Sequence, residues 1–148
     1  MDWTMVENDA FYKAFRGNFT SLLSWPQLDQ FWNVIREKAD AGWYIYAIGT
    51  AVPAQPSPAE AVTKFIAEVD ALLRDEHHED YCGIVYTDSK ENPTLVKIFD
   101  PNHLGVSCGF SNNPPLPGWV LSLIPPQSLE GKRPLAAGRH RWWQALWS

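Results

Sequence analysis

The chain has 148 residues, of which 45% are hydrophobic and 20% charged, a composition typical of one globular domain and not of a disordered chain. Its formal net charge of −5 argues against a general nucleic-acid-binding protein, which needs a cationic surface to neutralise phosphates. No apolar run approaches the roughly 18 residues that span a bilayer, and the N-terminus lacks the features of a signal peptide. We therefore expect a soluble, cytoplasmic, single domain over residues 1–148, with no membrane or nucleic-acid partner.

Residues 1–24 are predicted to be a lead-in that packs on the main body. Phe11 and Phe15 share one face of a short predicted helix, because residues four apart in a helix are neighbours on its surface. Leu22 and Leu23, which follow this helix, need burial in an apolar environment. This segment is therefore expected to lie against the rest of the chain.

The first long helix is expected over residues 26–41. Ser24 and Gln27 have the spacing of a capping box, in which each side chain bonds the backbone N–H of the other residue. Gly42 is a natural stop for this helix, and the aromatic and β-branched run 43–48 after it is typical of a strand. One apolar stripe runs along the helix and consists of Leu28, Phe31, Trp32, Ile35 and Ala39.

The capping-box spacing of Ser57 and Glu60 predicts the start of a second helix, which is expected to run to about Glu76. Its apolar face consists of Val62, Phe65, Ile66, Val69, Leu72 and Leu73. A strand, a helix and a second strand in succession form a βαβ unit. Strands 43–48 and 81–86 are therefore expected to be parallel, with a right-handed crossover.

The remaining elements complete a two-layer domain. The polar run 87–93 suits a hairpin loop between strands 81–86 and 94–99, a fourth strand covers 119–124, and a short helix covers 139–147. The predicted fold class is α+β. It consists of a mixed four-stranded sheet with one βαβ unit and one hairpin, two main helices on one face, and short N- and C-terminal helices.

The first candidate site is the segment 100–118, 19 residues with four prolines and three glycines. Connections longer than about 12–15 residues without regular structure are uncommon in compact domains and are often functional. Its candidate binding residues are Asn102, Ser107, Gly109 and Asn112.

The same segment contains the residue types of a thiol-dependent hydrolase or transferase. Cys108 would be the nucleophile, His103 the base and Asp100 the group that orients the base. The structural alternative is that Cys108 is a packing residue and that Asp100 bonds the backbone of an ordinary turn. The spacing matches no specific catalytic motif, so both interpretations stay open.

A metal site and a nucleotide site are both weakly supported. The run His77-His78-Glu79-Asp80, together with His103, offers nitrogen and oxygen ligands, but neither HExxH nor a cysteine pair occurs. A solvated helix end explains the run equally well, because His near a helix C-terminus suits the helix dipole. No glycine-rich phosphate loop occurs either, so we predict neither a metal nor a cofactor.

The second candidate site is the tail 127–148, which is basic and rich in tryptophan. Residues 131–141 carry four of the 12 basic residues and no acid, which leaves 8 basic residues against 17 acidic ones elsewhere. Its candidate binding residues are Arg139, Arg141, Trp142, Trp143 and Trp147. Trp and Arg are favoured anchors at protein interfaces, and they also stack on bases or lie at membrane surfaces. The alternative is a tail that folds back as a lid over the uncovered face of the sheet.

The leading hypothesis from the sequence is a small non-enzymatic binding or accessory protein. It would present the segment 100–118 and the aromatic tail to a protein partner. The thiol-dependent enzyme is the alternative, and a homodimer formed through the uncovered face of the sheet is a further expectation.

Overall fold

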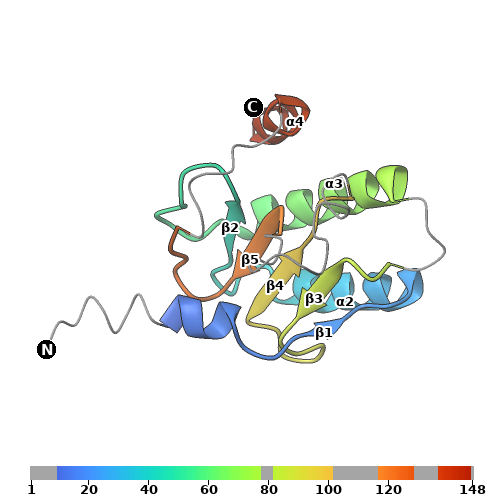
Figure 1. Cartoon of the computed structure of the whole chain (residues 1–148). Helices are drawn as coiled ribbons and strands as arrows, with labels where there is room; N and C mark the ends of the chain where they lie inside the picture. Colours follow the sequence, from blue (N-terminus) through green and yellow to red (C-terminus); the bar gives the residue numbers. More distant parts are fainter. Residues whose placement is uncertain (1–9, 78–81, 102–116, 129–136, 148) are drawn as a thin grey trace, which may run out of the picture.

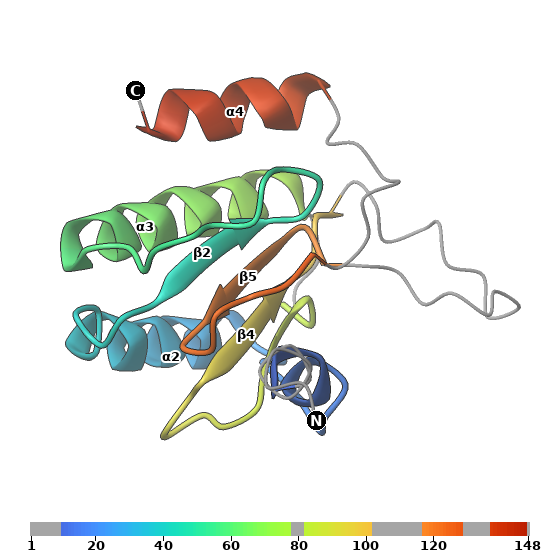
Figure 2. The same cartoon turned by 90° about the vertical axis from the view of Figure 1, so that its left-hand side faces the viewer.

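The computed structural model describes residues 10–77, 82–101, 117–128 and 137–147. Two helices, α2 and α3, cover one face of a five-stranded sheet, and a further helix, α4, lies on the outer side of α3 (Figures 1 and 2). The elements in chain order are β1 (Thr20–Ser21), α2 (Trp25–Glu37), β2 (Tyr44–Ala47), α3 (Ala59–Glu76), β3 (Val85–Thr87), β4 (Leu95–Ile98), β5 (Trp119–Ser122) and α4 (Ala137–Trp147). The predicted α+β class is confirmed. Within these ranges, no helix has the length and apolar character to cross a membrane.

The sheet has the strand order β1-β3-β4-β5-β2, and every neighbouring pair is antiparallel. The predicted hairpin between β3 and β4 is confirmed, with Val85 opposite Ile98. The predicted four-stranded mixed sheet and its βαβ unit are wrong, because β4 and β5 separate β2 from β3, and these two strands run in opposite directions. A helix between two strands must cover a sheet face, but it does not require the strands to be neighbours.

The two main helices begin in different ways. The capping box of α2 is confirmed: Ser24 Oγ accepts from the backbone N–H of Gln27 at 3.1 Å, and Gln27 Oε1 accepts from the backbone N–H of Ser24. The capping box predicted for α3 is wrong, because α3 starts after Pro58 without a side-chain cap. The backbone N–H of Ser57 instead donates to the carbonyl of Trp43 at 2.7 Å. The residue that precedes β2 therefore orients the chain that enters α3.

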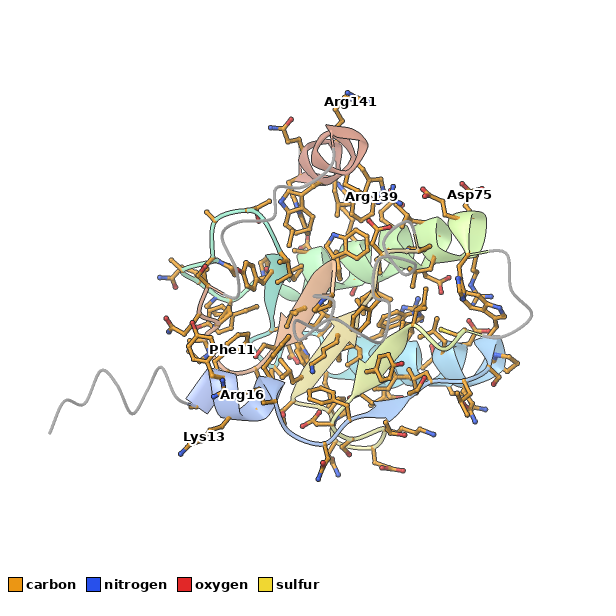
Figure 3. The ribbon with its side chains drawn as sticks, in the orientation of Figure 1. Phe11, Lys13, Arg16, Asp75, Arg139 and Arg141 are labelled. Carbon is orange, nitrogen blue, oxygen red and sulfur yellow. The ribbon has the colours of Figure 1, made fainter. Side chains whose placement is uncertain are left out.

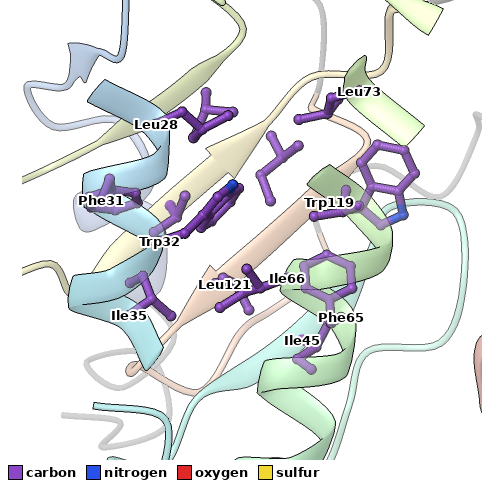
Figure 4. Packing of buried hydrophobic residues seen from close by; sticks show 14 of the residues in the cluster. Leu28, Phe31, Trp32, Ile35, Ile45, Phe65, Ile66, Leu73, Trp119 and Leu121 are labelled. Carbon is purple, nitrogen blue, oxygen red and sulfur yellow. The ribbon is translucent and has the colours of Figure 1, made fainter. Parts of the chain in front are cut away.

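The main core lies between the two helices and the sheet (Figure 4). The predicted alternation along β5 is confirmed, because Trp119 and Leu121 face the helices while Val120 belongs to the cluster on the other face. The labelled core residues are Leu28, Phe31, Trp32, Ile35, Ile45, Phe65, Ile66, Leu73, Trp119 and Leu121. The indole N–H of Trp32 donates to Asp70 Oδ1 at 3.1 Å, which joins α2 to α3.

The other face of the sheet is covered by the N-terminal segment, residues 10–19. Phe11 is fully buried in a second apolar cluster that includes Tyr46 of β2 and Val120 of β5. The predicted packing of the lead-in on the body is thus confirmed for its described part. Two expectations are wrong: this face is not left uncovered, and Leu23 is 60% exposed instead of buried.

Candidate binding surface on the C-terminal helix

Arg139, in the first turn of α4, is clamped between two carboxylates from different elements. It donates to Asp100, two residues after the end of β4, through Nε at 2.7 Å and Nη2 at 3.0 Å. It donates to Glu76, the last residue of α3, through Nη1 at 3.1 Å and Nη2 at 2.6 Å. Arg139 lies between α4 and α3 in Figure 3. One guanidinium therefore joins α4 to the ends of α3 and β4.

This clamp is an electrostatic unit with little contact to water. The side chains of Arg139 and Asp100 are only 11% and 5% exposed, whereas Glu76 is 28% exposed. The hydrogen bonds to Asp100 raise the pKa of Arg139 above its ordinary value, and those to Glu76 add to this effect against the opposing effect of burial. The two carboxylates therefore favour the charged form of the Arg139 guanidinium.

The position of Asp100 depends on close backbone packing at the start of β5. A Cβ placed on Gly118 would lie 3.3 Å from the Asp100 Cβ, which is tighter than an ordinary contact. The backbone N–H of Gly118 donates to the carbonyl of Ile98 at 2.8 Å, so β4 and β5 are still paired there. Glycine thereby allows the Asp100 carboxylate to sit where Arg139 can reach it.

Aromatic side chains attach the rest of α4 to the body. Trp142 meets Trp119 of β5 edge to face, with ring centroids 5.4 Å apart, and Trp143 meets Phe65 of α3 in the same way at 6.2 Å. Leu146 is 3% exposed and belongs to the main core. Such contacts combine burial of large apolar area with a defined ring geometry. They hold the inner side of α4 against α3 and β5.

The outer flank of α4 combines an exposed indole with a cation. Trp147 is 40% exposed and meets Trp143 edge to face, with ring centroids 5.4 Å apart. Arg141 is exposed and points away from the body (Figure 3). Leu23 and Trp147 are the large hydrophobic residues that stay exposed in the described part of the chain. We call Arg141 and Trp147 the outer flank of α4.

The structure distributes the candidate residues of the tail over both sides of this helix. Arg139 and Trp142 lie on the inner side, whereas Arg141 and Trp147 lie on the outer flank. The helix α4, which is most of the described part of the tail, folds back on the body as one alternative predicted. It packs on α3 and β5, however, and not over the sheet face that the N-terminal segment covers.

Most of the candidate loop residues lie outside the described residues: Asn102, His103, Ser107, Cys108, Gly109 and Asn112. His78, Glu79 and Asp80 lie outside them as well. The Asp100 carboxylate, predicted to orient His103, accepts hydrogen bonds from Arg139. The thiol-enzyme hypothesis stays a prediction.

The other described titratable groups near this end of the fold have structural contacts. His77 is buried, with Nε2 2.9 Å from the carbonyl oxygen of Cys82. Cys82 is a free, buried thiol whose pKa is raised by burial. In the part of the chain that can be placed, no three His, Cys, Asp or Glu side chains are grouped to hold a metal ion.

Sequence reasoning missed two features of the charged residues. Glu76 was not recognised as a partner of Arg139, because 63 residues separate them and no local spacing relates them. The second is Lys97, whose Nζ lies 4.1 Å and 4.0 Å from the ring centroids of Phe15 and Phe19. Burial lowers the pKa of Lys97. The sequence signal for the contact between Arg139 and Glu76 is that Arg139 lies in an aromatic segment, because a charge buried there requires a partner.

Comparison of the chain with protein-family models, with curated proteins and with solved structures gives no match.

Proposed function

We propose that this chain is a small non-enzymatic binding protein that presents the outer flank of α4 to a protein partner. The segment 100–118, most of which lies outside the described residues, is proposed as a second contact surface for the same partner. One observation carries the proposal: α4 is attached firmly through its inner side, yet Trp147 is 40% exposed on the outer flank.

The composition of the outer flank supports a protein partner. Trp and Arg are the residue types most enriched among those that contribute most to interface affinity. A surface helix with no further role normally carries polar residues on its outer side. Here Trp147 contacts Trp143, which in turn contacts Phe65 of α3. Arg141 adds a guanidinium, so we expect the partner surface to combine an apolar pocket with a carboxylate.

The attachment of α4 also favours binding, because a pre-organised surface loses little conformational freedom when a partner binds. Arg139 fixes the first turn of the helix through four hydrogen bonds. Leu146 fixes the last turn in the core. These contacts at both ends of α4 hold the outer flank in one orientation in the absence of a partner.

Photo-crosslinking from the outer flank tests this proposal. A photoreactive amino acid is placed at Gln144, an exposed position of α4, and crosslinked proteins are identified by mass spectrometry in a lysate of the source cells. We expect one partner to crosslink saturably and to be lost with Trp147→Ala or Arg141→Ala. Its affinity is then measured with the purified proteins, and each substitution should weaken binding by about 1 kcal/mol or more.

Leu23→Ala is the matched control, because Leu23 is the other exposed large hydrophobic residue of the described chain and lies outside α4. This variant should crosslink and bind as the wild type does. A partner that binds Trp147→Ala and Leu23→Ala equally well would refute the role of the outer flank.

A further inference from the structure

Lys97 of β4 is a half-buried lysine on the sheet face that the N-terminal segment covers. This segment lies on the opposite side of the sheet from α2 and α3 (Figure 2). Nζ of Lys97 lies over two aromatic rings of the segment, 4.1 Å from the ring centroid of Phe15 and 4.0 Å from that of Phe19. We call Lys97, Phe15 and Phe19 the lysine cage. The negative faces of the two rings attract a positive charge on the nitrogen.

The surroundings of the lysine cage are largely apolar. The residues directly opposite Lys97 in the neighbouring strands are Tyr86 of β3 and Val120 of β5, so their side chains share its face of the sheet. Val120 and Leu95, which lies two positions before Lys97 on β4, belong to the apolar cluster on this face. One amine is thus set among aromatic and aliphatic side chains.

Within the described ranges, this amine has no polar partner that offsets its burial. No carboxylate there forms an ion pair with Nζ of Lys97, and no group accepts a hydrogen bond from it. The charged residues of the segment 10–19 are the exposed cations Lys13 and Arg16, and β3 and β5 contain no charged residue. The carboxylate of Asp88, which follows β3, accepts from the backbone N–H of Thr94. Burial lowers the pKa of Lys97, so a larger fraction of this amine is neutral and nucleophilic than of an exposed lysine.

The lysine cage favours a nitrogen cation with fewer N–H groups than an ammonium. An ammonium has three N–H donors that lose water on burial, and the rings interact with its charge without replacing those hydrogen bonds. Condensation with an aldehyde changes this balance. The neutral amine attacks the carbonyl carbon, the carbonyl oxygen leaves as water, and a protonated imine remains. Relative to the ammonium, two protons have left with that water, so the charge stays at the rings while one N–H donor remains instead of three.

We propose that Lys97 is a covalent binding site for an aldehyde with an apolar or aromatic body, which it holds as a protonated imine. Phe15 and Phe19 stabilise the charge of the imine, and the apolar cluster around Lys97 suits the body of the ligand. The outer flank of α4 lies in a different part of the fold (Figure 2). The site therefore does not depend on the proposed protein partner.

The test uses the full-length wild-type chain, benzaldehyde as the probe, and cyanoborohydride to reduce the imine to a stable secondary amine. Peptide mapping by mass spectrometry then gives the labelling rate of each lysine near neutral pH. Lys13 and Lys64 are internal controls, because they are exposed amines. We expect Lys97 to react at least about fivefold faster than either control, the ratio that corresponds to one cation–π contact. This preference should disappear in urea, and it should be smaller with glycolaldehyde, which has a polar body.

Phe19→Leu removes one ring of the lysine cage and should lower the preference for Lys97. Phe31→Leu is the matched control, because it makes the same change in the core on the other face of the sheet and should leave the preference unaltered.

Labelling of Lys97 at or below the rate of Lys13 and Lys64 in the native chain would overturn the site. An unaltered preference in a Phe19→Leu chain with native circular dichroism would overturn the role of the rings, and if that chain is unfolded the wild-type rates decide alone. Equal preference with benzaldehyde and glycolaldehyde would overturn the assignment of an apolar ligand.

Discussion

Replacing Arg139 with Ala should destabilise the protein by about 3–5 kcal/mol, the range for removing one partner of a buried ion pair. The substitution deletes four hydrogen bonds to carboxylates and leaves Asp100, 5% exposed, without its cation. The loss is measured as the change in free energy of unfolding from urea denaturation followed by circular dichroism.

The two carboxylates should contribute unequally, because they differ in contact with water. Asp100→Asn acts on the buried arm of the clamp and should cost about 2–3 kcal/mol, since charged hydrogen bonds in a buried site are the strong ones. Glu76→Gln acts on a side chain that is 28% exposed, where screening reduces the loss to about 1 kcal/mol. In the Arg139→Ala background, both substitutions should become neutral or stabilising, because the guanidinium that they would lose is already absent.

A loss below about 1 kcal/mol for Arg139→Ala would refute this reasoning, because it would place Arg139 among ordinary surface ion pairs. A Glu76→Gln variant less stable than Asp100→Asn would also contradict it, since burial would then not decide the contribution. Arg36→Ala is the matched control, because Arg36 bonds only the neutral side chain of Asn33 in an exposed position of α2. This control should change stability by less than about 0.5 kcal/mol.

Three further predictions test other described contacts. Trp119→Phe should destabilise the fold by about 1 kcal/mol less than Trp32→Phe. The reason is that Trp32 donates to Asp70, while the buried indole N–H of Trp119 has no acceptor among the described residues. Urea denaturation compares the two variants, and equal losses of stability would contradict the role of the hydrogen bond. Cys82 should react with iodoacetamide far more slowly in the native protein at pH 8 than in urea, because burial both shields the thiol and raises its pKa; peptide mapping gives the rate, and fast native alkylation would contradict the buried placement. Burial lowers the pKa of Lys97 in the folded state, so the unfolded chain binds more protons as the pH approaches 10.5, and the contribution of Lys97 to stability rises with pH in that window. The difference in free energy of unfolding between wild type and Lys97→Met, measured at pH 7 and pH 10, should therefore shift in favour of the wild type as the pH rises. A shift the other way would refute the desolvation argument.

Local patterns in the sequence determined the elements and their buried faces. Ser24 and Gln27 mark the start of α2, and the repeats of apolar residues at helical spacing marked the inner faces of α2 and α3. Alternation along β5 and the polar run after β3 predicted a sheet face and a hairpin. These features follow from contacts within a few residues, which the order of amino acids specifies directly.

Only the tertiary structure decided which distant surfaces meet. The order of the strands depends on how each apolar face is buried once the helices cover the sheet, and the connection through α3 permits both neighbouring and separated strands. The tail was recognisable from its composition as a candidate site, but its inner and outer sides were not. Arg139 reaches Asp100 and Glu76 across 39 and 63 residues, and no local spacing encodes such pairs. A buried charge demands a partner, but only the folded chain determines which carboxylates provide it.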